Sequence, residues 1–430
     1  MIPPVHSPSP VDPIRLTAVM AGAFWLLCLW RLGIPSEPYF DEVHYLPAAR
    51  ELLAMGDFRN PEHPLLGKEL IALGIAIFGD NPWGWRLMSS LAGAFAMFGA
   101  MRALWFASLS RVATIAYGIL LASGFLLFVH SRIAMLDIFA VSFLAAAYWQ
   151  CAAAMREPET GRSRLVAAGA FLGLAMAGKW SVVPLAMVPG IAFLVLRYGA
   201  GRRRLLLSRR GLPVPGIRLV EAAVWLGALP LAVYAATYLP AWGFTSGAIG
   251  APGEPTGLFD LHRQIIAMQS GITQPHPYQS DWPQWLLNLR GIWYLYEPVD
   301  GAQRGILLIG NPLTMLAGLA ALGWCLWRGL VRNDAAPLAI VILYAVALGF
   351  WMIADKPIQF YYHYLVPSMV LLAALALALD ALWRGGFKWV AAAILATSVA
   401  LFAFYYPILS AAELSGKMAF AKWAWLEGWR

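Results

Sequence analysis

Charged residues and cysteine are both scarce in this sequence, and each shortage excludes a class of protein. Asp, Glu, Lys and Arg make up only 13% of its 430 residues, whereas 60% are hydrophobic and 20 are tryptophan. Such an apolar composition is not that of a soluble domain. The three cysteines are scattered through apolar stretches, so neither a disulfide framework nor a cysteine-based zinc site is expected.

Several short motifs of soluble enzymes are missing as well. The chain has no phosphate-binding GxxxxGK[ST] loop, no HExxH zinc motif and no DxD motif of the kind that holds a metal-bound nucleotide sugar. A cytosolic nucleotide donor is therefore poorly supported. The net charge of +8 does not lead us to expect nucleic acid as a partner, because basic loops beside membrane spans produce the same excess.

The sequence is instead rich in long apolar stretches, many of which approach the ~20 residues that a bilayer-spanning helix needs. They predict an all-α polytopic membrane protein with about eleven spans in one helical bundle. The first stretch is expected to be an uncleaved anchor rather than a signal peptide. The stretches cover residues 16–33, 86–105, 112–129, 133–154, 165–182, 183–198, 219–240, 305–327, 336–353, 364–383 and 388–406.

Basic residues fall in alternate short connections between these stretches, which places those connections in the cytoplasm. The N-terminus is then cytoplasmic and the C-terminus external. Residues 34–85, the large loop 241–304 and the tail 407–430 are external, and the tail is amphipathic enough for a surface helix. The basic connections contain Arg102, Arg111, Arg156, Arg162, Arg164, Arg202, Arg203, Arg204, Arg209, Arg210, Arg218, Arg328, Arg332, Arg384 and Lys388.

The two larger external loops contain further structure. Leu65 to Phe78 is apolar but too short to cross a bilayer comfortably, so it is expected to lie along the membrane surface. Leu258 to Gln269 is compatible with a helix. The Trp- and Tyr-rich end of the second loop suits a belt at the membrane interface.

Unusual polar groups gather on this external face. The stretch from Glu37 to Lys68 holds the adjacent carboxylates Asp41 and Glu42 and two imidazoles, and smaller external turns add Arg132, Lys179 and residues 355–363. Polar groups near membrane depth are costly and tend to mark function. Their convergence predicts a site on the external side.

A carboxylate beside several cations suits sugar transfer from a lipid-borne phosphate to a hydroxyl. The hydroxyl needs a carboxylate to accept its proton, and the departing phosphate needs cations rather than a general acid. Because Asp41 and Glu42 are neighbours, they are not expected to flank a glycosidic bond as the two carboxylates of a hydrolase do. One is expected to be the base and the other to position the acceptor.

The same residues also have structural explanations, each adequate for a single residue. Carboxylates are favoured at a helix start, single cations beside spans extend to the interface, neighbouring opposite charges neutralise each other, and most histidines make structural hydrogen bonds. The helix-start explanation applies to Asp41 and Glu42, and the interface explanation to Lys68, Arg86 and Lys179. Neutralisation applies to Arg132 with Asp137, and structural hydrogen bonding to His63 and His363.

The chain resembles the protein O-mannosyltransferases, glycosyltransferase family 39, in several motifs that occur in the family's order. The combination of a DE pair, an HPLLGK segment and a late HxYxS-like segment makes the resemblance specific, and it extends over most of the chain. The motifs are FDEVHY at 40–45, HPLLGK at 63–68, GWRLMSSLAG at 84–93, SRIAMLD at 131–137, GKWS at 178–181, HPYQSDWPQW at 276–285 and QFYYHYLVPS at 359–368.

This resemblance implies a GT-C fold and an inverting transfer of mannose from a polyprenyl-phosphate carrier to Ser or Thr of an exported polypeptide, met during export. No metal and no cofactor are expected, and membrane lipids surround the enzyme in the plasma (inner) membrane. By motif, Asp41 is the catalytic base, Glu42 its acceptor-side partner, and Arg86 a contact of the donor phosphate.

The remaining site residues follow from motif, charge and face. Lys68, Arg132, Lys356, His63, His363 and Tyr362 are assigned to the donor. His44, His276, Tyr278 and Ser280 are assigned to the acceptor or to loop positioning.

The sequence departs from the family pattern in two places. HPLLGK stands where HPPLGK is more usual, which affects the turn. The external loop 241–304 is far too short for the MIR domain of larger members, and this indicates a prokaryotic form. Two alternatives stay open: a related GT-C transferase that moves another lipid-linked sugar to a lipid or glycan, and a lipid-sugar transporter or flippase.

Overall fold

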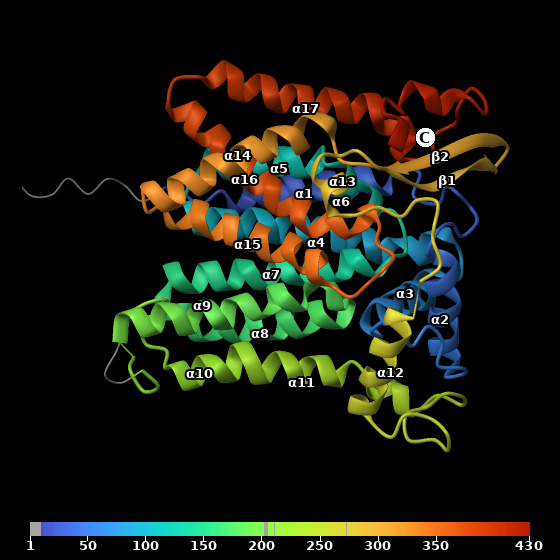
Figure 1. The fold of residues 1–430 in the computed structure, drawn as a ribbon, viewed down its shortest axis with the longest axis horizontal. Helices are drawn as coiled ribbons and strands as arrows, with labels where there is room; N and C mark the ends of the chain where they lie inside the picture. The colour runs from blue at the N-terminus through green and yellow to red at the C-terminus, as the bar shows by residue number, and fades with distance from the viewer. Residues whose placement is uncertain (1–9, 202–204, 210, 272) are drawn as a thin grey trace, which may run out of the picture.

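The computed structural model describes residues 10–201, 205–209, 211–271 and 273–430, which form a bundle of helices running along the long axis of the molecule (Figure 1). Arg202, Arg203, Arg204 and Arg210 of the expected cytoplasmic connection lie outside the described residues.

Within the described part of the chain, 8 helical segments are long and apolar enough to cross a membrane. They are α4 (Pro82–Ser108), α7 (Leu136–Arg156), Trp180–Gly199 with α9 (Val183–Gly201), Leu219–Ala236 with α10 (Leu219–Ala223) and α11 (Leu229–Ala236), α14 (Pro312–Val331), α15 (Ala335–Ile353), Tyr361–Arg384 with α16 (Leu365–Arg384), and α17 (Lys388–Leu409).

Helix is also present in the other three predicted stretches, in shorter or less apolar segments. These are α1 (Ile14–Leu29), α5 (Arg111–Ala122) followed by α6 (Phe125–His130), and α8 (Gly161–Gly178). One predicted boundary is wrong: residues 305–308 belong to a strand, and α14 begins only at Pro312, where a proline suits the first helical position. The predicted helical bundle is confirmed, whereas the predicted number of about eleven spans stays a prediction.

Glycines on α8 allow very close helix packing. A Cβ atom added to Gly169 would lie 1.9 Å from the Trp225 carbonyl oxygen, and one added to Gly173 would lie 2.6 Å from that of Pro230. Backbone contact of this kind is typical of membrane helices, whose association relies on close packing rather than on exclusion of water. Gly169 and Gly173 thereby let α8 pack directly against the backbone of the Leu219–Ala236 segment.

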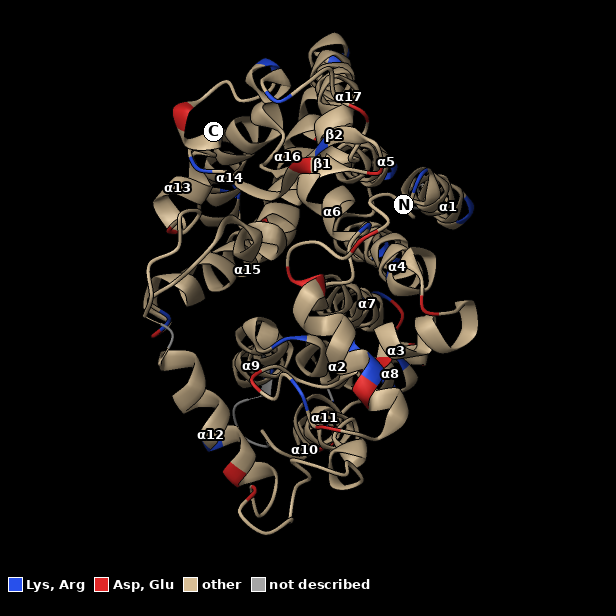
Figure 2. Ribbon diagram, turned by 90° about the vertical axis from the view of Figure 1, so that its right-hand side faces the viewer, with Lys and Arg blue, Asp and Glu red and all other residues tan. Residues whose placement is uncertain are grey.

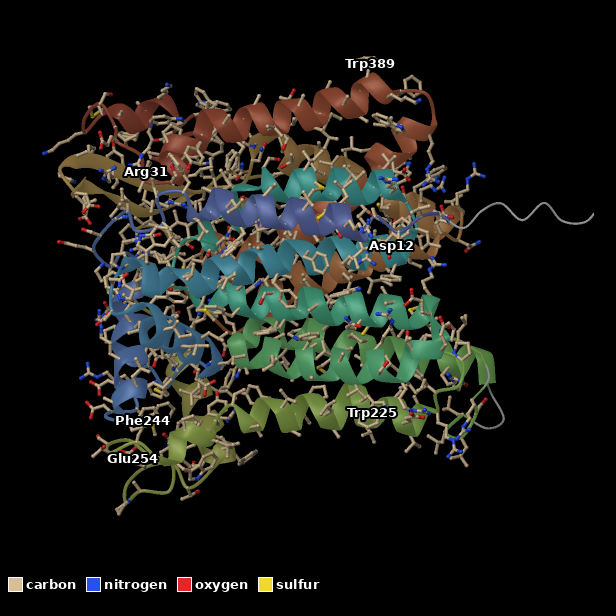
Figure 3. All side chains as sticks on the ribbon, turned by 180° about the vertical axis from the view of Figure 1, so that it is seen from behind. Asp12, Arg31, Trp225, Phe244, Glu254 and Trp389 are labelled. Carbon is tan, nitrogen blue, oxygen red and sulfur yellow. The ribbon has the colours of Figure 1, made fainter. Side chains whose placement is uncertain are left out.

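The loops that we expect to be external meet at one end of the bundle, and Figure 2 shows that end face on. It carries α2 (Glu42–Ala54), α3 (Leu66–Phe78), α12 (Leu258–Ser270) and α13 (Trp282–Leu286). The helices predicted at 65–78 and 258–269 are therefore confirmed as α3 and α12. In Figure 3, Arg31, Phe244 and Glu254 lie toward this end, whereas Asp12 lies toward the other.

The large loop also contains an antiparallel hairpin that the sequence reasoning did not predict. Strand β1 (Ile292–Val299) pairs with β2 (Ala302–Leu308), and the ladder is irregular between Trp293 and Leu295. Asp300 and Gly301 link the strands, both with positive φ. An Asp-Gly pair in this conformation forms a tight two-residue hairpin turn.

The surface helix predicted for the tail is wrong. Residues 410–430 form only two 3₁₀ turns, Ala419–Lys422 and Glu427–Trp429, whereas α17 continues to Leu409. The tail's tryptophans explain the difference, because Trp423 donates its indole N–H to the Phe404 carbonyl at 2.8 Å and Trp429 donates to the Asn288 carbonyl at 2.8 Å. These partners lie on different elements and hold the chain in an irregular path.

Candidate active site

A sharp turn separates the two adjacent carboxylates. Phe40 has φ of +52°, a conformation that bulky residues rarely adopt, and its ring stacks on Tyr294 of β1 with centroids 3.9 Å apart. Asp41 follows at the start of α2 and is partly exposed, whereas Glu42, the first residue of α2, is completely buried. The two neighbours therefore lie in different surroundings.

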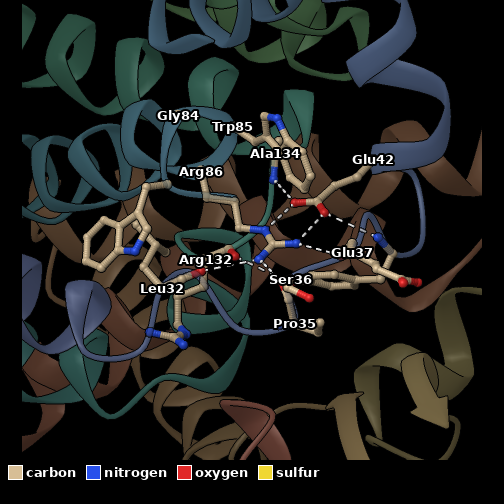
Figure 4. A network of polar contacts seen from close by, with 12 residues as sticks. Leu32, Pro35, Ser36, Glu37, Glu42, Gly84, Trp85, Arg86, Arg132 and Ala134 are labelled. Carbon is tan, nitrogen blue, oxygen red and sulfur yellow. Dashed lines mark hydrogen bonds and ion pairs between the residues drawn. The ribbon is translucent and has the colours of Figure 1, made fainter. Parts of the chain in front are cut away.

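Glu42 forms a two-pronged ion pair with Arg86 of α4 (Figure 4). The Nε and Nη2 atoms of Arg86 lie 2.8 Å from Oε1 and Oε2 of Glu42, respectively. Glu42 also accepts from the backbone N–H of Ala134 at 2.9 Å and, more weakly, from that of Tyr39 at 3.3 Å. Both side chains of the pair are 0% exposed, so Glu42 ties α2 to α4 and to the loop before α7.

Arg86 uses its other donors on the loop that precedes Asp41. Its Nη1 donates to the carbonyl oxygens of Leu32 at 3.3 Å and Pro35 at 2.6 Å, and its Nη2 donates to that of Glu37 at 3.1 Å. With the two bonds to Glu42, these contacts account for all five N–H groups of the guanidinium. This arrangement weighs against the expectation that Arg86 contacts a donor phosphate and indicates that it fixes the loop.

Lys68 and Arg132 are likewise turned toward backbone carbonyls. Lys68 is 1% exposed and donates to the carbonyls of Asn60 at 2.6 Å and His63 at 2.9 Å. Burial lowers the pKa of Lys68 to about 7. Arg132 is also buried, and it donates to carbonyls in and after the last turn of α1, those of Cys28, Trp30 and Arg31. Both cations stabilise the loops around the site.

Asp41 is much less constrained by hydrogen bonds than Glu42. Its carboxylate accepts one long bond, from the Tyr45 hydroxyl at 3.4 Å. Burial raises the pKa of Asp41; Lys179 opposes this rise, and Asp137 adds to it. Asp41 thus has the features of a base: a carboxylate that is accessible, has a raised pKa and keeps its lone pairs available.

Lys179 interacts with several charged groups of the cluster; the sequence placed it on this face but gave it no role in the site. Its Nζ lies 2.6 Å from Oδ2 of Asp137 and 5.0 Å from the centre of the Tyr362 ring. Lys179 also acts electrostatically on Asp41 and on Lys356. The motifs GKWS and SRIAMLD, which contain Lys179 and Asp137, were a signal for this pair. The sequence does not show that the two residues meet, because they are 42 positions apart.

Lys356 is the second cation of this cluster, and it is partly exposed. Burial and the neighbouring Lys179 lower its pKa to about 8. Its Nζ makes one long bond, to the Gln269 side chain at 3.3 Å, and Gln269 in turn donates to the Glu62 carbonyl at 3.2 Å. A single neutral partner leaves Lys356 free to exchange that partner for an anion.

The predicted histidines have different surroundings. His63 is partly buried with its ring edge-on to Tyr45 at 5.9 Å, and burial lowers its pKa well below the usual range. His44 is exposed on α2 beside Asp41. His363 is buried and stacked on Trp351 at 3.8 Å.

The protonation of His363 is set by its backbone partner. Its Nδ1 accepts from the Phe360 N–H at 3.1 Å, so the proton of the neutral ring is on Nε2, a buried atom without a partner among the described residues. His363 also lines a small cavity together with Asp137, Trp351 and Tyr362. The ring therefore offers one N–H donor for a ligand oxygen.

The late motifs predicted for the acceptor pack against the segment that carries Tyr362. His276 accepts from the Tyr278 N–H at 3.1 Å through Nδ1, and its ring meets Phe360 at 5.0 Å. Ser280 accepts from the Trp285 indole at 2.9 Å, and its N–H donates to the Gln359 carbonyl at 2.8 Å. These contacts indicate loop positioning.

The described residues contain no group of three or more His, Cys, Asp or Glu side chains arranged to hold a metal ion. The polar groups of the cluster are carboxylates, ammonium groups, hydroxyls and one imidazole N–H. Such a set suits proton transfer from a hydroxyl together with stabilisation of a phosphate.

Comparison with known proteins agrees with this arrangement. A family model described as dolichyl-phosphate-mannose-protein mannosyltransferase matches residues 62–225, and one described as the C-terminal four-transmembrane region of protein O-mannosyltransferase matches residues 256–334. Together they cover more than half of the chain. The chain belongs to the protein O-mannosyltransferase family.

A curated relative of this mannosyltransferase family extends over nearly the whole chain. It is the polyprenol-phosphate-mannose–protein mannosyltransferase of Mycolicibacterium smegmatis, 28% identical over 510 residues that include 99% of this chain and 97% of the relative. The match runs through the motif segments from FDEVHY to QFYYHYLVPS.

Solved structures show that the fold is GT-C. The Saccharomyces cerevisiae Pmt1–Pmt2 complex, bound to the sugar donor, contains a chain with a TM-score of 0.82 and 14% identity, covering 98% of this chain and 93% of that one. ArnT from Cupriavidus metallidurans, bound to undecaprenyl phosphate, has a TM-score of 0.54 and 17% identity, covering 85% and 60%. With the family models and the curated relative, the chain is a multi-pass membrane glycosyltransferase rather than the transporter considered above.

Proposed function

We propose that this protein transfers mannose from polyprenyl-phosphate-mannose to Ser or Thr hydroxyls of polypeptides. The name of the Mycolicibacterium relative, which matches 99% of the chain, supports the donor and the acceptor. Related GT-C transferases move other lipid-linked sugars, but the extent of this match favours mannose transfer. All residues 1–430 are taken as a single transmembrane domain.

The observation that carries the proposal is the contrast between the adjacent carboxylates. Asp41 is partly exposed, and its carboxylate accepts one hydrogen bond of 3.4 Å. Glu42 is fully buried, and its carboxylate accepts hydrogen bonds from Arg86 and from two backbone N–H groups. Only Asp41 is free to take a proton from an acceptor. Glu42 is assigned to holding the loop rather than to the acceptor.

The reaction follows from these roles. As Asp41 accepts the hydroxyl proton, the hydroxyl oxygen attacks the anomeric carbon of mannose, the bond from that carbon to the phosphate oxygen breaks, and its electron pair leaves with the phosphate. A single displacement inverts the configuration. The phosphate needs electrostatic stabilisation, for which Lys179 and Lys356 are the best placed of the candidate cations.

Other predicted residues support this centre. Tyr362 and His363 line the cavity beside Asp137 and are assigned to the donor, with His363 offering its Nε2–H. Lys68, Arg132 and Arg86 act through the loops they hold. His44 beside Asp41, and the turn at 276–280, are assigned to the acceptor side or to loop positioning.

The site is proposed to face the outside of the plasma (inner) membrane, where polypeptides are met during export. Arg102, Arg156, Arg328 and Arg384 occur in or beside the short connections at the end opposite Asp41, in agreement with a cytoplasmic N-terminus. A cysteine introduced at Glu254, on the loop-bearing end, should react with a membrane-impermeant maleimide in intact cells (Figure 3). Reaction only after lysis would reverse the orientation.

The activity is tested with the purified protein in lipid nanodiscs. Incubation with undecaprenyl-phosphate-mannose and a Ser/Thr-rich peptide should yield peptide that is heavier by one hexose, with an anomeric configuration opposite to that of the donor. Parallel reactions contain a donor with an amino-pentose, or a glycolipid acceptor. Transfer to the glycolipid without transfer to the peptide would overturn the proposal and favour the related GT-C activity.

A further inference from the structure

Asn288 is a buried junction between three parts of the external end. It lies between α13 and β1, with a φ of +55° that asparagine tolerates better than most residues. Its side chain pairs with both backbone groups of Gly310: Nδ2 donates to the carbonyl and Oδ1 accepts from the N–H, each at 2.9 Å. Asn288 thereby fixes the approach to α14.

The same side chain holds the turn that carries two proposed donor residues. The Tyr361 hydroxyl donates to Oδ1 of Asn288 at 2.7 Å, and Tyr361 is fully buried. The next residues in this 3₁₀ turn are Tyr362, which lies under the Lys179 ammonium, and His363. A shift of Tyr361 would therefore move both neighbouring side chains within the cavity.

Trp429 secures Asn288 from the other side. Its indole N–H donates to the Asn288 carbonyl at 2.8 Å, and its own carbonyl accepts from the Trp293 indole at 3.0 Å. A Cβ on the preceding Gly428 would lie 2.2 Å from the Leu289 carbonyl oxygen, so the tail backbone runs directly against this segment. A continuous set of hydrogen bonds thus joins Trp429 through Asn288 to Tyr361.

We propose that Trp429 and Asn288 are positioning residues for donor binding, acting through Tyr361 on Tyr362 and His363. The inference rests on the proposed function, because it takes these two side chains as contacts of the donor lipid phosphate. It assigns the irregular tail a role in the site. Small displacements of binding groups by distant changes are known to have large effects on binding and turnover.

The test compares two substitutions with matched controls in the full chain. Trp429→Phe and Tyr361→Phe each remove one donor of the chain of bonds and keep the ring. Trp425→Phe is the control in the tail, since its indole bonds to the Lys422 carbonyl. Tyr117→Phe is the control for a buried hydroxyl, because Tyr117 donates to the Met369 carbonyl at 2.9 Å, outside the Tyr361–Tyr364 turn. Equilibrium binding of undecaprenyl phosphate in nanodiscs, donor KM, kcat and thermal midpoint are measured for each.

Trp429→Phe and Tyr361→Phe should each weaken undecaprenyl phosphate binding and raise donor KM about five- to tenfold, with kcat changed by less than about twofold. The double variant should be no weaker than the worse single one, because both changes break the same chain of bonds. The controls should leave KM unchanged even where their thermal midpoints fall equally.

Equal KM values for Trp429→Phe and Trp425→Phe would overturn the inference. If Trp429→Phe does not fold, Tyr361→Phe against Tyr117→Phe decides in the same way. Lipid phosphate binding needs no mannose, so a wild-type protein that binds undecaprenyl phosphate but transfers no mannose would refute the proposed function while leaving this comparison intact.

Discussion

The ion pair between Glu42 and Arg86 gives a direct test of whether the second carboxylate has a structural or a chemical role. Glu42→Gln keeps the size of the side chain but removes its charge, which leaves the Arg86 guanidinium buried at 0% exposure without a compensating anion. Bonds from Arg86 to the carbonyls of Leu32, Pro35 and Glu37 remain.

The magnitude follows from the cost of an uncompensated buried charge. Removing one partner of a buried ion pair destabilises a protein by about 3–5 kcal/mol. Because three carbonyls still accept from Arg86, we place Glu42→Gln near ~3 kcal/mol. The double variant Glu42→Gln with Arg86→Gln should recover part of this loss, since no buried charge is then left. The two substitutions are therefore expected to be strongly non-additive.

The assay measures denaturant-induced unfolding in detergent beside mannosyl transfer well below the unfolding midpoint. Glu413→Gln is the matched control: Glu413 also lies near an arginine, Arg304, at 3.4 Å, but its side chain is 71% exposed. Removing such an exposed partner should cost less than about 1 kcal/mol. Glu42→Gln should unfold earlier yet retain measurable transfer at low temperature.

Two results would refute this account. Unchanged stability of Glu42→Gln with complete loss of transfer would make Glu42 part of the chemistry. Unchanged stability of Arg86→Lys with a selective rise in donor KM would instead restore Arg86 as a phosphate contact, as the sequence led us to expect.

Three further substitutions test the remaining roles. Asp41→Asn should lower kcat by about 10²-fold or more while undecaprenyl phosphate still binds, because the base is lost and the cations remain; retained turnover would exclude Asp41 as the base. Since the pKa of Lys356 is lowered to about 8, its charge is present below that pH and lost above it, so donor KM should rise as pH rises through about 8. Lys356→Gln should flatten that rise, and an unchanged profile would remove Lys356 from the donor site. Lys68→Met leaves the carbonyls of Asn60 and His63 without their donor and should destabilise the protein by about 1–3 kcal/mol, with kcat at low temperature retained; a stable variant with impaired donor binding would contradict this structural role.

The bundle and its functional end were predictable because the physical signals extend over many residues. Long apolar stretches identified the helices, and alternation of basic connections separated the two ends. The non-spanning helices α3 and α12 followed from length and pattern alone. The order of the motifs then identified the family.

The roles of individual cations were not predictable in the same way. Arg86 and Glu42 are 44 residues apart, and Lys179 and Asp137 are 42 apart, so their pairing depends on helix packing that the sequence does not display. The sequence does not distinguish a lysine that donates to backbone carbonyls, as Lys68 does, from one that faces a cavity. Burial is what separates supporting cations from those open to a ligand.

The hairpin was missed for a different reason. Asp300 and Gly301 are a recognisable turn signal, but the aromatic residues of β1 suited an interfacial belt equally well. The tail was mispredicted because its amphipathic pattern satisfies a helix locally, whereas the indole of Trp429 finds its partner on a distant segment. In the tail, a long-range hydrogen bond thus overrode local preference.

The left-handed turn at Phe40 bears on how Asp41, the proposed base, is held during turnover. The Phe40 ring stacks on Tyr294, and the Asp41 carboxylate next to it makes only one long hydrogen bond. The ring contact beside Asp41 joins neutral groups, whose attraction does not change when the carboxylate gains or loses a proton. The loop can keep one geometry through the whole cycle, so restoring the base after each transfer requires loss of a proton but no rearrangement of the chain.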